Sequence, residues 1–137
     1  MTRRFLTGLI GLWMVVTLAC GGASGGSRSN ELQRAHAGDL AVVLLSDGDA
    51  LKQGRSSFLL EFRRGNQLVD VGAVRVAATM PMAGMAPMFG GSQVRTSDAK
   101  GRYAVDTDLG MAGAWRFNVD WDGPAGKGTA SLSQTVR

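Results

Sequence analysis

The chain has 137 residues, 45% hydrophobic and 19% charged, which is enough for one small globular domain. Its single cysteine excludes an internal disulfide. The formal net charge of +4 falls to +2 beyond the N-terminal segment that holds Arg3 and Arg4, and no basic run with interleaved aromatic residues occurs, which argues against nucleic-acid binding.

The first twenty residues have the features of an export signal. Arg3 and Arg4 form a basic start, and the uncharged apolar stretch Phe5–Ala19 is shorter than the roughly 20 residues of a membrane-spanning helix. The stretch ends at Cys20 and resembles a bacterial lipoprotein signal, in which this cysteine receives diacylglycerol; Thr17 departs from the usual aliphatic residue. The alternatives are an ordinary cleaved signal peptide and a retained anchor.

The resemblance implies a signal peptide over residues 1–19 and a lipid on Cys20. The mature protein would then be an exported, membrane-anchored lipoprotein facing the periplasm. No Asp follows Cys20, which implies sorting to the outer membrane.

A Gly/Ser-rich segment follows the cysteine, and its composition is typical of a flexible linker. We predict a tether over residues 20–37 and one folded domain over residues 38–137. His36, the only histidine, then lies on the surface of the tether, and the alternative is a loosely tethered extra metal ligand.

The predicted domain alternates apolar and polar residues with period two, which is typical of half-buried strands. The residues 40–45 are apolar on both faces and indicate a strand covered on both sides. Later strands have one inward face each, and these predicted core residues are Phe58, Leu60, Phe62, Tyr103, Val105, Leu109, Trp115, Phe117, Val119 and Trp121. Turn compositions separate the strands at residues 46–49, 64–67, 97–101 and 122–128.

About seven short strands in about 100 residues are typical of an all-β fold, an immunoglobulin-like antiparallel β-sandwich. The last run, residues 129–136, is weakly patterned and indicates an edge strand.

Two motifs that suggest chemistry have simpler explanations. The segment GPAGKGT, residues 123–129, lacks the Ser or Thr and the first glycine of a phosphate-binding loop, and we predict a hairpin turn. The pair Asp106 and Asp108 and the pair Asp120 and Asp122 each share one strand face, but no calcium-binding loop spacing surrounds them. Because the chain offers no catalytic triad, carboxylate pair or cofactor motif, we do not expect an enzyme.

The segment TMPMAGMAPMFGG, residues 79–91, contains four methionines: Met80, Met82, Met85 and Met88. The preceding strand places Met80 and Met82 on its core face, so methionine as a flexible core filler is one explanation. The prolines at 81 and 87 and the glycines at 84, 90 and 91 then predict that the chain leaves the sheet, with Met85 and Met88 in a long loop.

Thioether sulfur is a soft, neutral ligand that favours Cu(I), and by the same softness Ag(I). In an oxidising compartment such a site is safer when built from methionine than from cysteine. The spacing alone leaves open a metal site, a core segment and an interaction surface.

Two motifs together resemble the YtkA-like domain, relatives of which are grouped with FixH-like proteins. They are MPMAGMAPM and, one strand-loop-strand later, GRYAVDTDLGMAGAW, and the resemblance covers about residues 38–136. The matching positions are Met80, Pro81, Met82, Gly84, Met85, Gly101, Tyr103, Met111, Gly113 and Trp115.

The resemblance implies an immunoglobulin-like sandwich outside the cytoplasmic membrane, found beside heavy-metal efflux adaptors and copper-oxidase assembly proteins. It also implies Met111 as a further ligand, if its turn shares one end of the sandwich with the methionine loop; the alternative is a hydrophobic plug above Trp115. Many relatives carry a histidine in or after the Met-Pro motif, and this chain does not, which favours a thioether-only Cu(I) site.

We therefore predict a lipid-anchored protein that holds or delivers Cu(I) or Ag(I). The expected ligands are Met80, Met82, Met85, Met88 and Met111. The alternative is a non-catalytic interaction module whose methionine loop docks a transporter or oxidase subunit without a metal.

Overall fold

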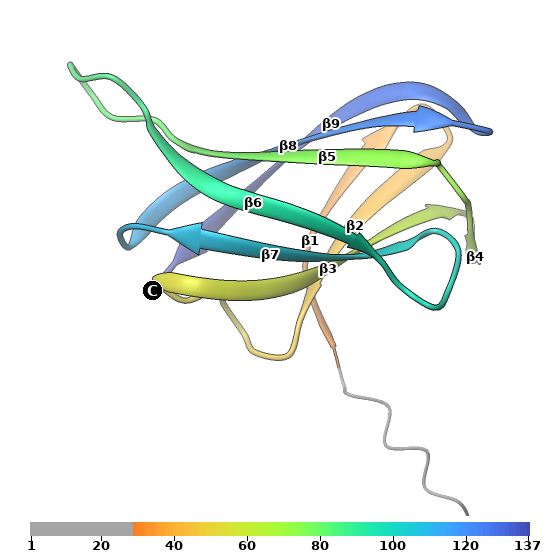
Figure 1. Ribbon diagram of the computed structural model, residues 1–137, viewed down its shortest axis with the longest axis horizontal. Coiled ribbons are helices and arrows are strands. Elements are labelled where there is room, and N and C mark those ends of the chain that lie inside the picture. Colours follow the sequence, from red (N-terminus) through yellow and green to blue (C-terminus); the bar gives the residue numbers. More distant parts are fainter. Residues whose placement is uncertain (1–28) are drawn as a thin grey trace, which may run out of the picture.

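The computed structural model describes residues 29–137, which form nine β-strands and no helix (Figure 1). The all-β prediction is confirmed. The strands are β1 (Asn30–Ala37), β2 (Leu40–Ser46), β3 (Gly54–Arg64), β4 (Gln67–Leu68), β5 (Ala73–Met80), β6 (Met88–Thr96), β7 (Arg102–Leu109), β8 (Gly113–Gly123) and β9 (Gly126–Val136).

All paired strands are antiparallel, in the order β1-β2-β3-β7-β6-β5-β8-β9, and β4 pairs with the end of β3. The two ends of this order, β1 and β9, lie beside each other, so the sheet is nearly closed like a barrel (Figure 1). Without β1 and β4, the seven remaining strands follow the order of an immunoglobulin-like sandwich, with β2-β3-β7-β6 in one layer and β5-β8-β9 in the other. The last strand, β9, lies at the end of the order, as expected of an edge strand.

The first strand lies in the segment that the sequence indicated as tether. Residues Asn30–Ala37 pair along most of their length with β2, from Asn30 beside Ser46 to Ala37 beside Leu40. Their apolar content is too low to indicate a strand by itself, and the pairing with β2 supplies the stabilising contacts. The predicted signal peptide, Cys20 and the first part of the tether lie outside the described residues.

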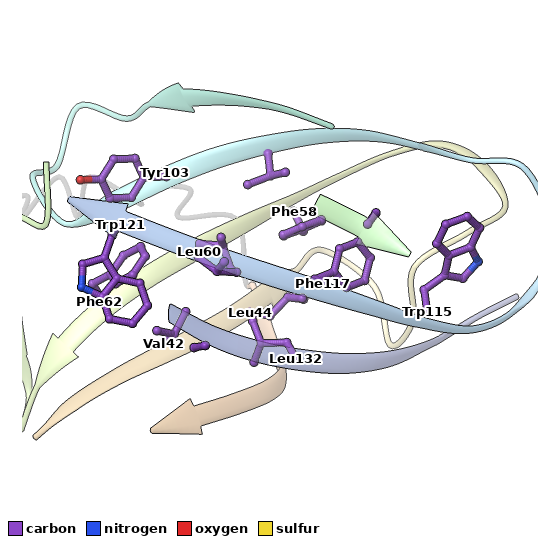
Figure 2. Close-up of a cluster of buried hydrophobic side chains, with 14 of the residues drawn as sticks. Val42, Leu44, Phe58, Leu60, Phe62, Tyr103, Trp115, Phe117, Trp121 and Leu132 are labelled. Carbon is purple, nitrogen blue, oxygen red and sulfur yellow. The ribbon is translucent and has the colours of Figure 1, made fainter. Parts of the chain in front are cut away.

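The alternation of apolar and polar residues defines the core. All ten inward-facing residues predicted for the later strands are buried, and Figure 2 labels seven of them, with neighbours from β2 and β9. Phe58 and Phe117 meet edge to face in the middle of the barrel, with ring centroids 5.2 Å apart. The sequence pattern therefore identified the core residues correctly, because the side-chain period of a strand is two.

The outer face of β2 is also buried, as the apolar run predicted. Val43 is 1% exposed and faces Glu61 across the sheet. Glu61 is itself fully buried and forms ion pairs with Arg63 and Arg102. Each oxygen of this buried carboxylate accepts a hydrogen bond from one arginine. A buried charge without such partners would be strongly destabilising.

The sixth strand joins the two layers of the sandwich. Its first three residues pair with β5, and those from Gly91 onward pair with β7. Gly90 lies at this change of partner, where a β-carbon would be 2.9 Å from the carbonyl oxygen of Asp108 and 3.2 Å from the ring of Trp115. Gly90 and Gly91, which suggested a loop, therefore belong to a strand, and at Gly90 only a residue without a side chain permits this close approach.

The end of the barrel formed by Phe62, Tyr103 and Trp121 is called the aromatic end below. Phe62 meets both other rings edge to face, at centroid distances of 5.5 and 5.3 Å. The fully buried Val71 packs against this core from the chain between β4 and β5, and the Tyr103 hydroxyl donates a hydrogen bond to the carbonyl oxygen of Gly72 at 2.9 Å. Polar and apolar contacts together close this end.

Candidate functional site

The opposite end of the barrel carries the methionine segment and is called the methionine end below. Residues 81–87 connect β5 to β6 and project from the barrel (Figure 1). Pro81 and Pro87 bracket this loop, and within it Gly84 has φ +70°. The Met85 amide donates to the Met82 carbonyl oxygen at 3.4 Å, which folds the loop into a turn.

Two of the methionines stand opposite each other at the base of the loop. Met80 ends β5, Met88 begins β6, and the two are partners in the antiparallel register. Both side chains are partly buried and pack against the core. The prediction that Met88 lies in the loop was wrong, because the strand resumes directly after Pro87.

The connection between β7 and β8, residues 110–112, lies against this pair. A β-carbon built on Gly113 would lie 2.5 Å from the Met80 methyl carbon and 3.5 Å from its sulfur. A β-carbon on Gly110 would lie 3.6 Å from the Met88 sulfur. The side chains of Met80 and Met88 therefore contact the connection at two glycines, Gly113 and Gly110.

That same connection carries Met111. Its carbonyl oxygen accepts a hydrogen bond from the indole N–H of Trp115 at 2.9 Å, and its side chain is 37% exposed. Trp115 itself is 1% exposed, so the buried ring fixes the backbone that presents Met111. The methionine loop and the connection that carries Met111 therefore share one end of the sandwich, as a ligand role for Met111 requires.

The five predicted ligands thus occupy three different environments. Met80 and Met88 are half-buried beside the connection that carries Met111. Met82 is half-buried within the loop, and Met85 is 64% exposed at its turn. The fold brings Met80 and Met88 beside the connection that carries Met111, and Met85 is the most solvent-exposed of the five.

The chemistry available at this end is thioether chemistry. No charged residue occurs in residues 76–94 or 109–115. Within residues 29–137, no group of three or more His, Cys, Asp or Glu side chains could hold a metal ion. A metal at the methionine end would therefore be held by soft, neutral sulfur, which suits monovalent Cu(I) or Ag(I).

Sequence reasoning missed three residues of this end. Gly113 makes room for the methyl group of Met80, Gly110 lies beside the Met88 sulfur, and Phe89 is 73% exposed on the outer face of β6. Gly113 stood in the matched motif, but its role depends on a contact with Met80 that sequence spacing does not give. Phe89 would have been found by alternation if β6 had been recognised as a strand.

His36 does not contribute to the methionine end. It is an exposed residue of β1 and pairs with Ala41, whose partner in β3 is Arg63. This position is near the aromatic end, because Arg63 lies at the other end of β3 from Gly54. The alternative in which His36 supplies a further ligand is therefore not supported.

A polar groove of about 670 Å³ lies across β3, β7 and β6. Its Asp106 accepts a hydrogen bond from Ser57 at 2.7 Å and pairs with Arg95 at 2.6 Å, and these contacts, the Ser57 bond first, lower the pKa of the Asp106 carboxyl. The aspartates of this face are thus solvated strand residues, as the sequence indicated. The lysine-bearing segment near residue 127 is likewise a hairpin turn, in which Lys127 pairs with Asp122 at 2.9 Å.

Among the described residues, no helix is long and apolar enough to span a bilayer. No curated protein and no solved structure matches the chain. The family model described as YtkA-like matches residues 34–120, from within β1 to within β8, which is more than half of the sequence. The match includes the β5–β6 hairpin and the β7–β8 connection, and so contains the whole methionine end. The chain therefore belongs to the YtkA-like family.

Proposed function

We propose that this protein is a lipid-anchored, periplasm-facing accessory protein that holds or delivers Cu(I) or Ag(I) through its methionine end. The processes it would serve are heavy-metal efflux or the assembly of a copper enzyme. We propose no catalytic turnover.

One observation carries the proposal. The side chains of Met80 and Met88, on paired strands, lie against a connection that bears a third methionine, and the positions beside them, 110 and 113, are glycines. A core that needed only apolar volume would be filled equally well by Leu, so two methionines side by side at this end favour a use for their sulfur. The arrangement offers two or three thioethers to one ion.

The donor set also supports selectivity for a soft monovalent ion. Thioethers carry no charge, so they leave a divalent ion such as Zn²⁺ poorly neutralised. They also carry no proton in the range between about pH 5 and 8, so binding would be nearly independent of pH there.

The geometry gives the ligands an order. Met80, Met88 and Met111 form the central set, and Met82 is close enough along the chain to join it if the loop folds inward. Met85 is the weakest candidate, because its side chain points largely into solvent.

The test is competition for Cu(I) against a calibrated chelator under reducing conditions, with the full protein in detergent. Replacing Met80 and Met88 together by Leu should weaken binding by on the order of 100-fold or more, since even changes outside the ligand set of metal sites cost 10–100-fold. The fold should survive, because Leu preserves the apolar volume.

Met85→Leu is the matched control, since it makes the same chemical change at an exposed position of the same loop. It should change the affinity much less. If the Met80/Met88 variant competes as well as the wild type, or if neither protein competes, the methionine end is not a copper site.

The anchor rests on the sequence, since Cys20 lies outside the described residues. The uncharged apolar stretch that ends at the only cysteine supports it. Mass spectrometry of the membrane fraction should show an acylated N-terminus at Cys20, and a soluble, unmodified protein cut elsewhere would contradict the anchor.

The alternative function is an interaction module that docks a transporter or oxidase subunit and binds no metal. The exposure of Met85 and Phe89 favours it. Such a module would keep most of its activity when Met80 and Met88 become Leu, so the same variant separates the two functions.

A further inference from the structure

Three large hydrophobic side chains are strongly exposed in the described part of the chain, and all three lie at the methionine end. They are Met85 at 64%, Phe89 at 73% and Met111 at 37%. Met85 lies in the loop that projects from the barrel, and Phe89 follows on the adjoining strand (Figure 1). The exposed apolar surface is therefore concentrated at a protruding hairpin, here called the hairpin tip and defined as residues 79–91.

The hairpin tip carries no charge. Neither the tip nor its flanks contain a charged residue between Arg75 and Arg95. Arg116 lies on the same face, since Phe89, Thr79 and Arg116 occupy one row across β6, β5 and β8, and on the other side Asp108 pairs with Gly91. An apolar tip with a cation set back from it is the arrangement that suits a membrane interface, where apolar groups enter the acyl boundary and basic groups meet anionic headgroups.

The exposure of Phe89 has no explanation within the fold. Its neighbours Met88 and Gly90 face the interior, so Phe89 must face outward by the alternation of the strand. Most positions on the outer face of a soluble sheet carry polar residues, as Gln93 does on the same strand. A phenylalanine at this position is stabilised only when something apolar covers it.

We propose that the hairpin tip inserts into the outer part of a phospholipid bilayer, with Met85 and Phe89 entering the acyl boundary and Arg116 at the headgroups. Membrane contact goes beyond metal binding and uses Phe89, which is no candidate ligand, and Met85, which is the weakest one. Met80 and Met88 remain half-buried beside the core, so the proposed metal pair does not need to reach the lipid.

The chain that precedes the barrel supports a bilayer as the occupant. It contains the apolar stretch Phe5–Ala19 and then Cys20, which is separated from Ser29 by eight residues. At about 3.3–3.6 Å per residue this segment spans roughly 30 Å at most. If a lipid on Cys20 or an uncleaved apolar stretch holds the chain, the barrel stays within about its own length of the bilayer, and a weak tip contact then suffices.

Contacts within the fold connect the chain entry to the methionine end. The side-chain amide of Asn30 donates a hydrogen bond to the carboxylate of Asp49, in the connection between β2 and β3, at 3.4 Å. Gln53 of the same connection donates to the carbonyl oxygen of Gly110 at 3.0 Å. One connection therefore touches both the first strand and the turn beside the proposed tip.

The experiment measures the depth of the tip with the full chain in vesicles of phosphatidylethanolamine and phosphatidylglycerol. Met85→Cys is labelled with an environment-sensitive fluorophore, and part of the lipid carries brominated acyl chains. Cys20 is the only native cysteine, so labelling of the wild type gives the blank for any unmodified thiol. A Cu(I) chelator is present throughout, so that the result does not depend on metal.

Brominated lipid should quench the label at residue 85, because interfacial side chains lie roughly 5–10 Å deep in the bilayer. The matched position is Asp98→Cys in the turn between β6 and β7, at the other end of the barrel, where no quenching is expected. Adding Phe89→Ser should reduce the quenching at residue 85, whereas Gln93→Ser, an exposed polar position of the same strand, should leave it unchanged.

Equal quenching at residues 85 and 98, or none at residue 85, would overturn the proposal. Protection of residue 85 that occurs only when host membrane proteins are added would also overturn it, in favour of a protein partner. Copper competition with the Met80/Met88 variant is unaffected by either result, so failure of membrane insertion and failure of metal binding are separate outcomes.

Discussion

At the aromatic end of the barrel, three rings meet edge to face, and Tyr103 is hydrogen-bonded to the chain that crosses beneath it. The methionine end has one buried indole, two half-buried thioether side chains, a turn flanked by two glycines, and a projecting loop. Figure 2 shows the asymmetry, with Phe62, Tyr103 and Trp121 gathered on one side and Trp115 alone on the other.

The two ends differ in how rigidly their side chains are held. Aromatic rings have few rotatable bonds and fixed contact geometries, so they hold one end in one arrangement. Methionine is flexible and its sulfur is polarisable, so the other end can adapt to an ion or a surface. The structure therefore combines flexible side chains at the methionine end with a rigid aromatic end. The buried Trp115 forms part of the core at the methionine end.

The largest expected effect tests whether the tightly packed core extends to the methionine end, beneath its flexible surface side chains. Trp115→Ala should destabilise the protein by about 3–5 kcal/mol, as is typical of a buried tryptophan, and should also free the Met111 carbonyl oxygen. Chemical denaturation measures the change, and Arg116→Ala, at the exposed neighbouring position, is the control that should stay within about 0.5 kcal/mol. A Trp115→Ala variant with wild-type stability would mean that the core does not extend to this end.

The second prediction compares two glycines with similar backbone angles at opposite ends. Gly101 has φ +83°, and a β-carbon there would lie 2.6 Å from the carbonyl oxygen of Val69. Gly101→Ala should therefore cost about 2–4 kcal/mol, from overpacking against backbone together with the left-handed conformation.

Gly84 in the methionine loop has φ +70° and nothing within 4 Å of the same position. Gly84→Ala should cost about 1 kcal/mol or less in thermal or chemical unfolding, because the loop can relax the backbone strain. Equal losses for Gly84 and Gly101 would show that the two ends do not differ in rigidity.

The smallest expected effect concerns the polar contact of the aromatic end. Tyr103→Phe removes the hydrogen bond to Gly72 and should cost about 0.5–1.5 kcal/mol. Burial, and then the charge of Asp70, raise the pKa of the Tyr103 phenol above its ordinary value of 10.0.

A raised folded-state pKa means that the fold favours the neutral phenol. Its contribution to stability is fully present below the unfolded pKa of about 10 and is lost as the pH rises through the higher folded-state pKa. Unfolding measured between pH 9 and 11 should therefore show a steeper alkaline loss for the wild type than for Tyr103→Phe. Identical slopes would mean that the phenol does not contribute to closing this end.

Several features of the protein followed from local sequence alone. The alternation of apolar and polar residues identified the fold class and all ten predicted core residues, since strand side chains alternate between faces whatever the partner strand. Pro81 and Pro87 marked the loop correctly, because proline cannot donate to a sheet ladder. The two short motifs of the methionine segment and the Met111 turn indicated the family.

Other features depended on contacts between distant parts of the chain. Residues Asn30–Ala37 form a strand because β2 offers an edge to pair with. Gly90 is a glycine within a strand because Trp115 and Asp108 lie too close to its backbone for a side chain. The approach of Met80 and Met88 to the turn that carries Met111 likewise depends on the order of strands in the closed sheet. Composition and spacing report each segment's own preferences, whereas such contacts arise from packing across the barrel, which no single segment encodes.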